Sequence, residues 1–149
     1  MAATNLFWTR GYDGTSLADL TEAMAISPSS LYAAFGDKKA LFAEAVVGYA
    51  QRYTAIYIAA VAEPTARAAV ERLLRASVDE FTDPERPMGC LTVSAAMSGG
   101  ADTIDVRETL REQQASLAGI LRERIDDDVA SGRLPADTDS ALLAECRRA

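Results

Sequence analysis

The stretch from Gly14 to Phe42 contains two signals for the start of a helix. They lie so close together in the sequence that the first helix must be short. Leu17, Leu20 and Met24 recur at spacings of three and four residues, which predicts one apolar stripe on a short helix. Thr15 precedes this stripe, and its hydroxyl suits the N-cap of that helix. The segment therefore predicts a compact pair of helices, of which this is the first.

The second helix begins at Ser27-Pro28, because serine favours the N-cap and proline favours the first helical position. Leu31 and Phe35 carry its apolar stripe, and Gly36 suits the left-handed residue that ends it. Two compact helices joined by a turn of roughly three or four residues outline a helix-turn-helix, whose second helix enters the major groove of DNA.

Four pieces of this region follow one another in a specific order: the opening Gly11–Ser16, the turn Ala23–Ser27, the recognition helix Leu31–Phe35, and the helix entry Asp37–Phe42. In this order and spacing they resemble the DNA-binding domain of the TetR/AcrR family of bacterial transcriptional regulators. The resemblance covers the first third of the chain. It implies an all-α fold, in which a three-helix helix-turn-helix domain (residues 1–45) continues into a helical ligand-binding and dimerisation domain (residues 46–149).

The resemblance also implies a function. Such a protein is a ligand-responsive regulator, most often a repressor, which binds a palindromic operator of double-stranded DNA as a homodimer. Its inducer is expected to be a small apolar or aromatic molecule, and no cofactor or metal is expected. Against the family pattern both ends of the chain look short, so truncation of a longer protein is an expectation at this point.

The DNA contacts are expected from short polar side chains, which reach base edges and phosphates without holding the backbone away. DNA contact is favoured for Ser29 and Ser30, whereas capping explains Ser27 equally well. By resemblance Tyr32 and Lys38 contact phosphates, although burial in the small core competes as the role of Tyr32. For Thr15 and Ser16, helix capping is an equally good explanation. The residues expected to contact DNA are Thr15, Ser16, Ser27, Ser29, Ser30, Tyr32 and Lys38.

Charge and side-chain size weaken this DNA-binding surface. The net charge is −7, and the positive groups near the motif are Arg10, Lys38 and Lys39. Lys39 stands where relatives often carry an acidic residue and is expected to be solvated. The turn residue that is usually glycine is Ala25 here, at a cost of roughly 1 kcal/mol if it is left-handed. Ala33 and Ala34 leave base readout to few side chains.

The rest of the chain is expected to be helical, with no sheet. Before the motif we expect a helix over residues 3–10. After it we expect one helix over residues 38–62 and another from beyond Pro64 to residue 82. A loop at residues 83–87 then leads to a helix over residues 89–98, which breaks at Gly99-Gly100. A long helix then keeps Val106, Leu110, Leu117, Leu121, Ile125 and Val129 on one face and stops at Gly132, and an eighth helix starts near Asp137 or Thr138.

Aromatic residues suggest an inducer pocket. Tyr49, Tyr53 and Tyr57 recur at every fourth residue and share one helix face. They could line an apolar pocket, and an ordinary core role is the alternative interpretation, favoured for at least one of them. Phe81, Cys90 and Met97 are further candidates. Cys90 could also sense oxidants, although packing is the simpler role.

Other functions have less support. Without histidine the chain lacks the usual nucleophile partner and the commonest metal ligand, so an enzyme that uses Cys90, or Glu80 with Asp83, is a remote alternative. No catalytic residue is expected. A helical scaffold that keeps the fold without binding DNA is the nearer alternative. No apolar run is long enough for a bilayer, which favours a cytoplasmic protein without a membrane partner.

Overall fold

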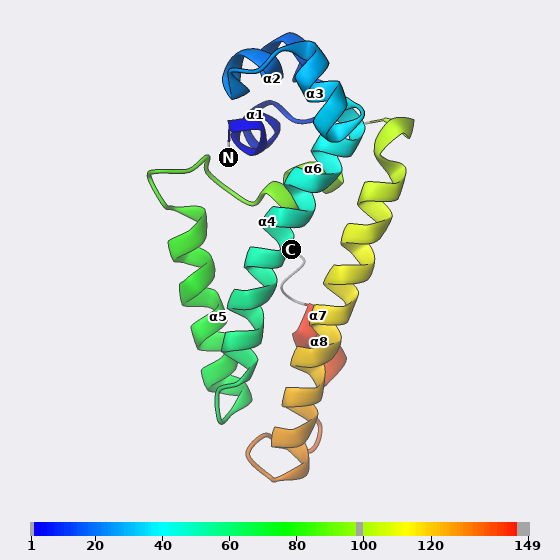
Figure 1. Cartoon of the computed structure of the whole chain (residues 1–149). Helices are drawn as coiled ribbons and strands as arrows, with labels where there is room; N and C mark the ends of the chain where they lie inside the picture. Colours follow the sequence, from blue (N-terminus) through cyan, green and yellow to red (C-terminus); the bar gives the residue numbers. More distant parts are fainter. Residues whose placement is uncertain (1, 98–99, 146–149) are drawn as a thin grey trace. The chain divides into compact units, whose positions relative to one another are not determined.

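The computed structural model describes residues 2–97 and 100–145, and Figure 1 shows their path. The helices are α1 (Ala2–Arg10), α2 (Leu17–Met24), α3 (Pro28–Phe35), α4 (Lys38–Val61), α5 (Ala66–Phe81), α6 (Leu91–Met97), α7 (Ile104–Ala130) and α8 (Ser140–Glu145), with a short 3-10 helix η1 (Ala101–Thr103) before α7. No β-strand occurs in these two ranges, so the predicted all-α class is confirmed. None of the helices found there combines the length and the apolar character that crossing a bilayer requires.

Most helix boundaries lie within two residues of those expected, and the differences at the starts of α6 and α8 have local causes. α6 begins at Leu91 instead of residue 89, because Gly89 has a φ of 85°, which is incompatible with a right-handed helix. Its expected end at residue 98 lies outside the described residues. α8 begins at Ser140, since the Asp139 carboxylate accepts a hydrogen bond from the Leu142 N–H at 2.9 Å and so caps this helix. Thr138 instead belongs to the preceding turn, where its hydroxyl donates to the Pro135 carbonyl.

The chain divides into two compact units, and the first contains the helix-turn-helix. It takes the residues up to Arg52 together with Glu80–Leu110. Within it α1 contacts both α2 and α6, and α2 contacts α3. An aromatic group holds its core together: the rings of Phe7 and Phe42 meet edge to face at 5.0 Å, and Tyr12 lies 5.1 Å from Phe42. The predicted apolar faces of the two short helices point into this core, because Leu20 and Leu31 are fully buried.

The second unit takes Tyr53–Asp79 and the residues from Arg111 onward. Its buried core consists of Tyr57, Ala60, Ala66, Leu73, Leu117, Leu121, Ile125 and Ala144. The continuous apolar face predicted for α7 is confirmed, since five of its six residues are buried and Val129 is half-buried. The boundary expected at residues 45 and 46 stays a prediction.

Candidate nucleic-acid interface

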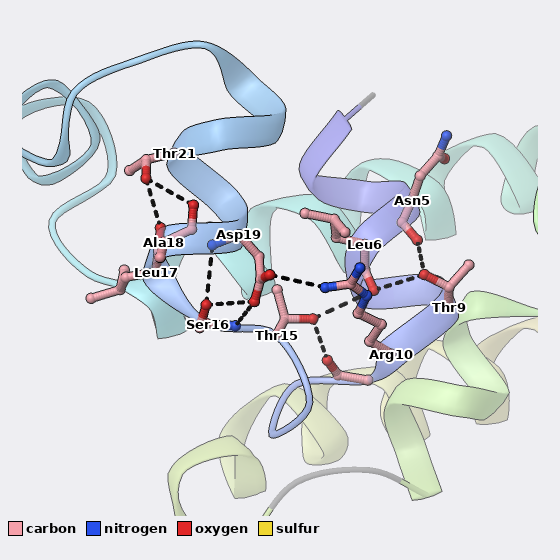
Figure 2. A network of polar contacts seen from close by, with 11 residues as sticks. Asn5, Leu6, Thr9, Arg10, Thr15, Ser16, Leu17, Ala18, Asp19 and Thr21 are labelled. Atoms are coloured by element: carbon pink, nitrogen blue, oxygen red, sulfur yellow. Dashed lines mark hydrogen bonds and ion pairs between the residues drawn. The ribbon is translucent and has the colours of Figure 1, made fainter.

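Ser16 is the residue that caps α2. Its Oγ accepts a hydrogen bond from the Asp19 N–H at 3.1 Å, while the Asp19 carboxylate accepts one from the Ser16 N–H at 2.8 Å (Figure 2). This reciprocal pair is a capping box, and it satisfies two backbone donors that a helix end otherwise leaves free. The spacing Ser-x-x-Asp, from Ser16 to Asp19, is the sequence signal for this box.

Thr15 has a different role from the one expected. Its side chain is fully buried, and its hydroxyl donates to the Gly11 carbonyl at 2.8 Å, with the Leu6 carbonyl at 3.4 Å (Figure 2). The N-cap interpretation of Thr15 is therefore wrong, because the hydroxyl points back to the end of α1. A phosphate cannot reach a fully buried side chain, so Thr15 fastens the loop between α1 and α2 in this structure.

An ion pair joins the same capping box to α1. Arg10 Nη1 lies 3.0 Å from Asp19 Oδ1, and Figure 2 shows how the two side chains meet between the helices. The pKa of Asp19 lies below its usual range, mainly because its carboxylate accepts hydrogen bonds from Ser16. The hydrogen bond and the positive charge of Arg10 lower this pKa further. The positive charge of Arg10 is thus already paired in the free protein.

The turn between α2 and α3 depends on one left-handed alanine. Ala25 has φ 53° and ψ 41°, and its N–H donates to the carbonyl of Glu22 while closing α2. The left-handed conformation expected at this position is confirmed. A methyl side chain here costs roughly 1 kcal/mol relative to glycine, and the turn keeps its form nevertheless.

Three serine hydroxyls meet at the start of α3. Ser27 is the N-cap, since its Oγ accepts the Ser30 N–H at 3.1 Å. The same oxygen lies 2.8 Å from Ser29 Oγ and 2.9 Å from Ser30 Oγ. All three residues are exposed, so the hydroxyls of Ser29 and Ser30 are available to a ligand beyond the cap. The positive end of the helix dipole also lies here, which favours an anion such as a phosphate.

The outer surface of α3 carries few large side chains. Tyr32 is 50% exposed, so the competing interpretation of Tyr32 as a core residue does not hold in this structure. Ala33 and Ala34 are exposed as well, whereas Leu31 is fully buried. Gly36 ends the helix with φ 83° and ψ −64°, a positive φ as expected but outside the left-handed helical region.

The two lysines that begin α4 have different surroundings. Lys38 Nζ lies over the ring of Tyr12, 4.2 Å from its centroid. Lys39 Nζ lies 2.9 Å from Asp105 Oδ2 in the first turn of α7, so the expectation of a merely solvated Lys39 is wrong. Nothing in the local sequence indicated that partner, because it follows after several intervening helices.

The expected inducer-binding residues do not share one environment. Tyr49 is buried in the first unit, where its ring meets Trp8 edge-on at 4.8 Å and its hydroxyl donates to Cys90 Sγ at 3.7 Å. Burial is the main reason that the pKa of Tyr49 is raised. In the second unit, Tyr57 is fully buried and the half-buried Tyr53 bonds Ser77 through its hydroxyl at 3.1 Å.

The other three candidates differ in exposure. Phe81 and Cys90 are half-buried. Cys90 packs against the core of the first unit, which agrees with the packing role expected for it. Met97 is 83% exposed at the end of α6. A shallow groove of about 120 Å³ in the first unit contains none of the six candidates; its walls are Ala43, Val46, Val47, Asp105, Val106, Thr109 and Leu110.

The acidic pair considered for catalysis is bridged by arginine. Arg86 lies 2.7 Å from the buried carboxylate of Glu80 and 3.2 Å from Asp83, and Arg52 reaches Glu80 at 3.2 Å. These ion pairs give both carboxylates a structural role. Within residues 2–97 and 100–145 no group of three His, Cys, Asp or Glu residues could hold a metal ion.

Two family models match the chain. Residues 1–45 match the model described as "Bacterial regulatory proteins, tetR family", and residues 66–146 match "Tetracyclin repressor-like, C-terminal domain". Together they cover the helix-turn-helix and most of the helices that follow it.

Several characterised proteins are similar over nearly the whole chain. The HTH-type transcriptional repressor ComR of Escherichia coli (strain K12) is 32% identical over 145 residues, which is 96% of this chain and 69% of that protein. The structure of a cysteine mutant of the regulator CifR, complexed with 26-bp double-strand operator DNA, is 44% identical with a TM-score of 0.84 and covers 96% of this chain and 75% of that one. PfmR from Thermus thermophilus shares the fold at 23% identity, with a TM-score of 0.77 over 97% of this chain and 76% of that one.

Proposed function

The chain belongs to the TetR family of transcriptional regulators, and from this premise we propose that it binds double-stranded operator DNA as a homodimer, with α3 in the major groove. The observation that carries the proposal is the exposed outer surface of α3, where Ser29, Ser30 and Tyr32 stand around a helix start that favours phosphate. CifR, which is 44% identical, forms a complex with double-strand operator DNA, and this supports operator binding by the present chain.

Base readout in this proposal depends on small groups. The hydroxyls of Ser29 and Ser30 can accept or donate at base edges, and the exposed methyl groups of Ala33 and Ala34 suit apolar contact with the methyl group of thymine. Tyr32 and Lys38 then fix the position of the helix through phosphates. Since one such helix contacts few bases, specificity requires two copies. A dimer reads a palindrome whose half-sites lie about 34 Å apart.

We also propose that a small apolar or aromatic molecule regulates this binding, as a shift between two populations of the dimer. The half-buried Tyr53, with its hydroxyl turned to Ser77, offers the mixture of apolar wall and polar tip that such ligands use. Tyr49 and Tyr57 serve their cores first, so they are weaker candidates for direct contact with a ligand.

A scaffold that keeps the fold without binding DNA is the second candidate, and the charges favour it. Arg10 and Lys39, two of the three positive side chains in residues 1–45, form ion pairs with Asp19 and Asp105. Phosphate attraction is correspondingly reduced.

Binding to labelled duplexes separates the two functions. Duplexes that tile the DNA flanking the coding region are titrated by fluorescence anisotropy at low salt, with unlabelled competitor DNA. The proposal predicts that one duplex binds specifically and takes up two chains. Ser29→Ala should then lower the affinity about two- to tenfold for each α3 bound, the equivalent of one hydrogen bond per chain.

Ser131→Ala is the matched control, because this serine lies at the end of α7 and its hydroxyl donates to the Asp127 carbonyl. The control should bind like the wild type. A protein that binds no tile more tightly than competitor DNA is the scaffold instead.

A further inference from the structure

Residues 1–45 contain three positive side chains, Arg10, Lys38 and Lys39, and two of them are ion-paired. Arg10 pairs with Asp19 at 3.0 Å, and Lys39 pairs with Asp105 at 2.9 Å. Across the described residues 2–97 and 100–145, Lys38 has no ion-pair partner within 4.0 Å. Its ammonium group lies instead on the face of Tyr12, 4.2 Å from the ring centroid.

An aromatic face affects a lysine differently from a carboxylate. The ring attracts the ammonium group through its quadrupole and fixes where it lies, but the ring carries no net charge. The full positive charge of Lys38 therefore stays available to an incoming phosphate. An ion-paired lysine would first have to leave its partner, which costs part of the binding free energy.

Tyr12 is held firmly enough to act as such a platform. It is only 8% exposed, its ring stacks on Phe7 with an interplanar angle of 18°, and it lies 5.1 Å from the ring of Phe42. Its backbone carbonyl accepts the Thr15 N–H at 3.3 Å. The fully buried Thr15 thus ties down the loop that carries the ring.

We propose that Tyr12 is a positioning residue for DNA binding, whose ring orients the ammonium group of Lys38 toward a backbone phosphate. This inference rests on the proposed function, because it adds the ring of Tyr12 as a support for the phosphate contact proposed for Lys38. It explains how an acidic protein keeps one effective cation at its DNA-binding surface. It also gives the buried tyrosine of the loop a role beyond core packing.

A double-mutant cycle on DNA binding tests the coupling. The probe is the tightest-binding tile from the flanking DNA, or a random 30-bp duplex at low salt, because a phosphate contact does not depend on sequence. Lys38→Met should lower the dependence of log affinity on log salt by about one unit for each α3 bound. Tyr12→Leu should weaken binding about three- to tenfold when Lys38 is present. In the Lys38→Met background it should weaken binding by less than about twofold, because the phosphate contact that Tyr12 supports is already absent there.

Two ring variants keep the test decisive if Tyr12→Leu fails to fold. Tyr12→Phe retains the ring face that holds the ammonium group, so its affinity for the duplex should stay within about twofold of the wild type. Replacement of Tyr12 by pentafluorophenylalanine keeps a six-membered ring but reverses its quadrupole, so it should weaken binding only while Lys38 is present.

Equal losses in both Lys38 backgrounds would mean that Tyr12 supports the fold alone, and they would overturn the inference while leaving DNA binding intact. A wild-type protein that binds neither the tiles nor the random duplex would overturn the proposed function itself.

Discussion

The Nζ of Lys39 lies 2.9 Å from Oδ2 of Asp105, which joins the first turn of α4 to the first turn of α7 within the first unit. This hydrogen-bonded pair raises the pKa of Lys39 and lowers the pKa of Asp105. Both side chains remain partly exposed, at 41% and 64%, so the pair contributes little to stability. Its main consequence is that the charge beside Lys38 is neutralised.

Removal of that acidic partner should strengthen DNA binding. In Asp105→Asn, Lys39 is free to meet a phosphate, so we expect a higher affinity for duplex DNA and a salt dependence steeper by up to about one unit for each α3 bound. The melting temperature should change by less than about 3 °C. The measurement is anisotropy of a labelled duplex over a salt series.

The matched control is Asp137→Asn, which removes one negative charge from an exposed residue near the start of α8. If both variants gain equally, the gain reflects net charge alone and Lys39 has no part in it.

Loss of the α2 cap should destabilise the first unit. Ser16→Ala removes the acceptor of the Asp19 N–H, and we expect the free energy of unfolding to fall by about 1 kcal/mol. Urea unfolding followed by circular dichroism measures this loss. Thr9→Ala is the comparison, because the Thr9 hydroxyl is exposed and only donates to the Asn5 and Leu6 carbonyls within its own helix. A loss from Ser16→Ala no greater than that from Thr9→Ala would contradict the capping box.

Two neighbouring serines should separate stability from binding. Ser27→Ala removes the N-cap of α3 and should lower stability by about 1 kcal/mol together with DNA affinity. Ser29→Ala leaves the cap in place and should lower DNA affinity while stability changes by less than about 0.5 kcal/mol. Parallel urea unfolding and anisotropy titrations compare the two variants. Equal effects of both on stability would show that Ser29 is also structural.

Asp128 should make the second unit sensitive to acid. This residue is only 2% exposed; its carboxylate accepts the Ala66 N–H at 2.7 Å, and the Arg133 Nε at 2.9 Å. The hydrogen bond from Arg133 is the main reason that its pKa is lowered. A lowered pKa stabilises the fold above the unfolded value of about 3.9, and this contribution is lost as the pH falls through the folded value.

Melting curves of Asp128→Asn test that linkage. The variant should melt at least about 3 °C below the wild type at pH 7, and the gap should narrow as the pH falls from about 5 toward 2. Asp127→Asn, at the exposed neighbouring position, should follow the wild type throughout. A difference in melting temperature that stays constant with pH would mean that Asp128→Asn destabilises the protein for a reason other than the lost negative charge.

Local signals in the sequence were enough to predict the helix-turn-helix. Ser27 and Pro28 start α3 as expected, and the left-handed Ala25 lies where the turn requires it. These features depend on neighbours within a few residues, which the sequence places together. The same holds for the apolar face of α7, whose period identifies the buried apolar residues of this helix.

Features that depend on distant neighbours were missed. Thr15 and Ser16 are both good capping residues, and the choice between them is made by the Gly11 and Leu6 carbonyls, which bind the Thr15 hydroxyl. Asp128 and Ala66 meet although they lie 62 residues apart. Tyr49 and Tyr57 share a helix face but serve two different cores, because α4 passes through both units.

Amide hydrogen exchange, measured with and without the tightest-binding duplex, tests the central proposal most directly. We expect slower exchange at the start of α3, from Ser27 to Tyr32, and at the start of α4 around Lys38, since these backbone groups would lie against DNA. A specific complex that forms with unchanged exchange at both helix starts would contradict the account, because the DNA would then be held by another surface of the protein.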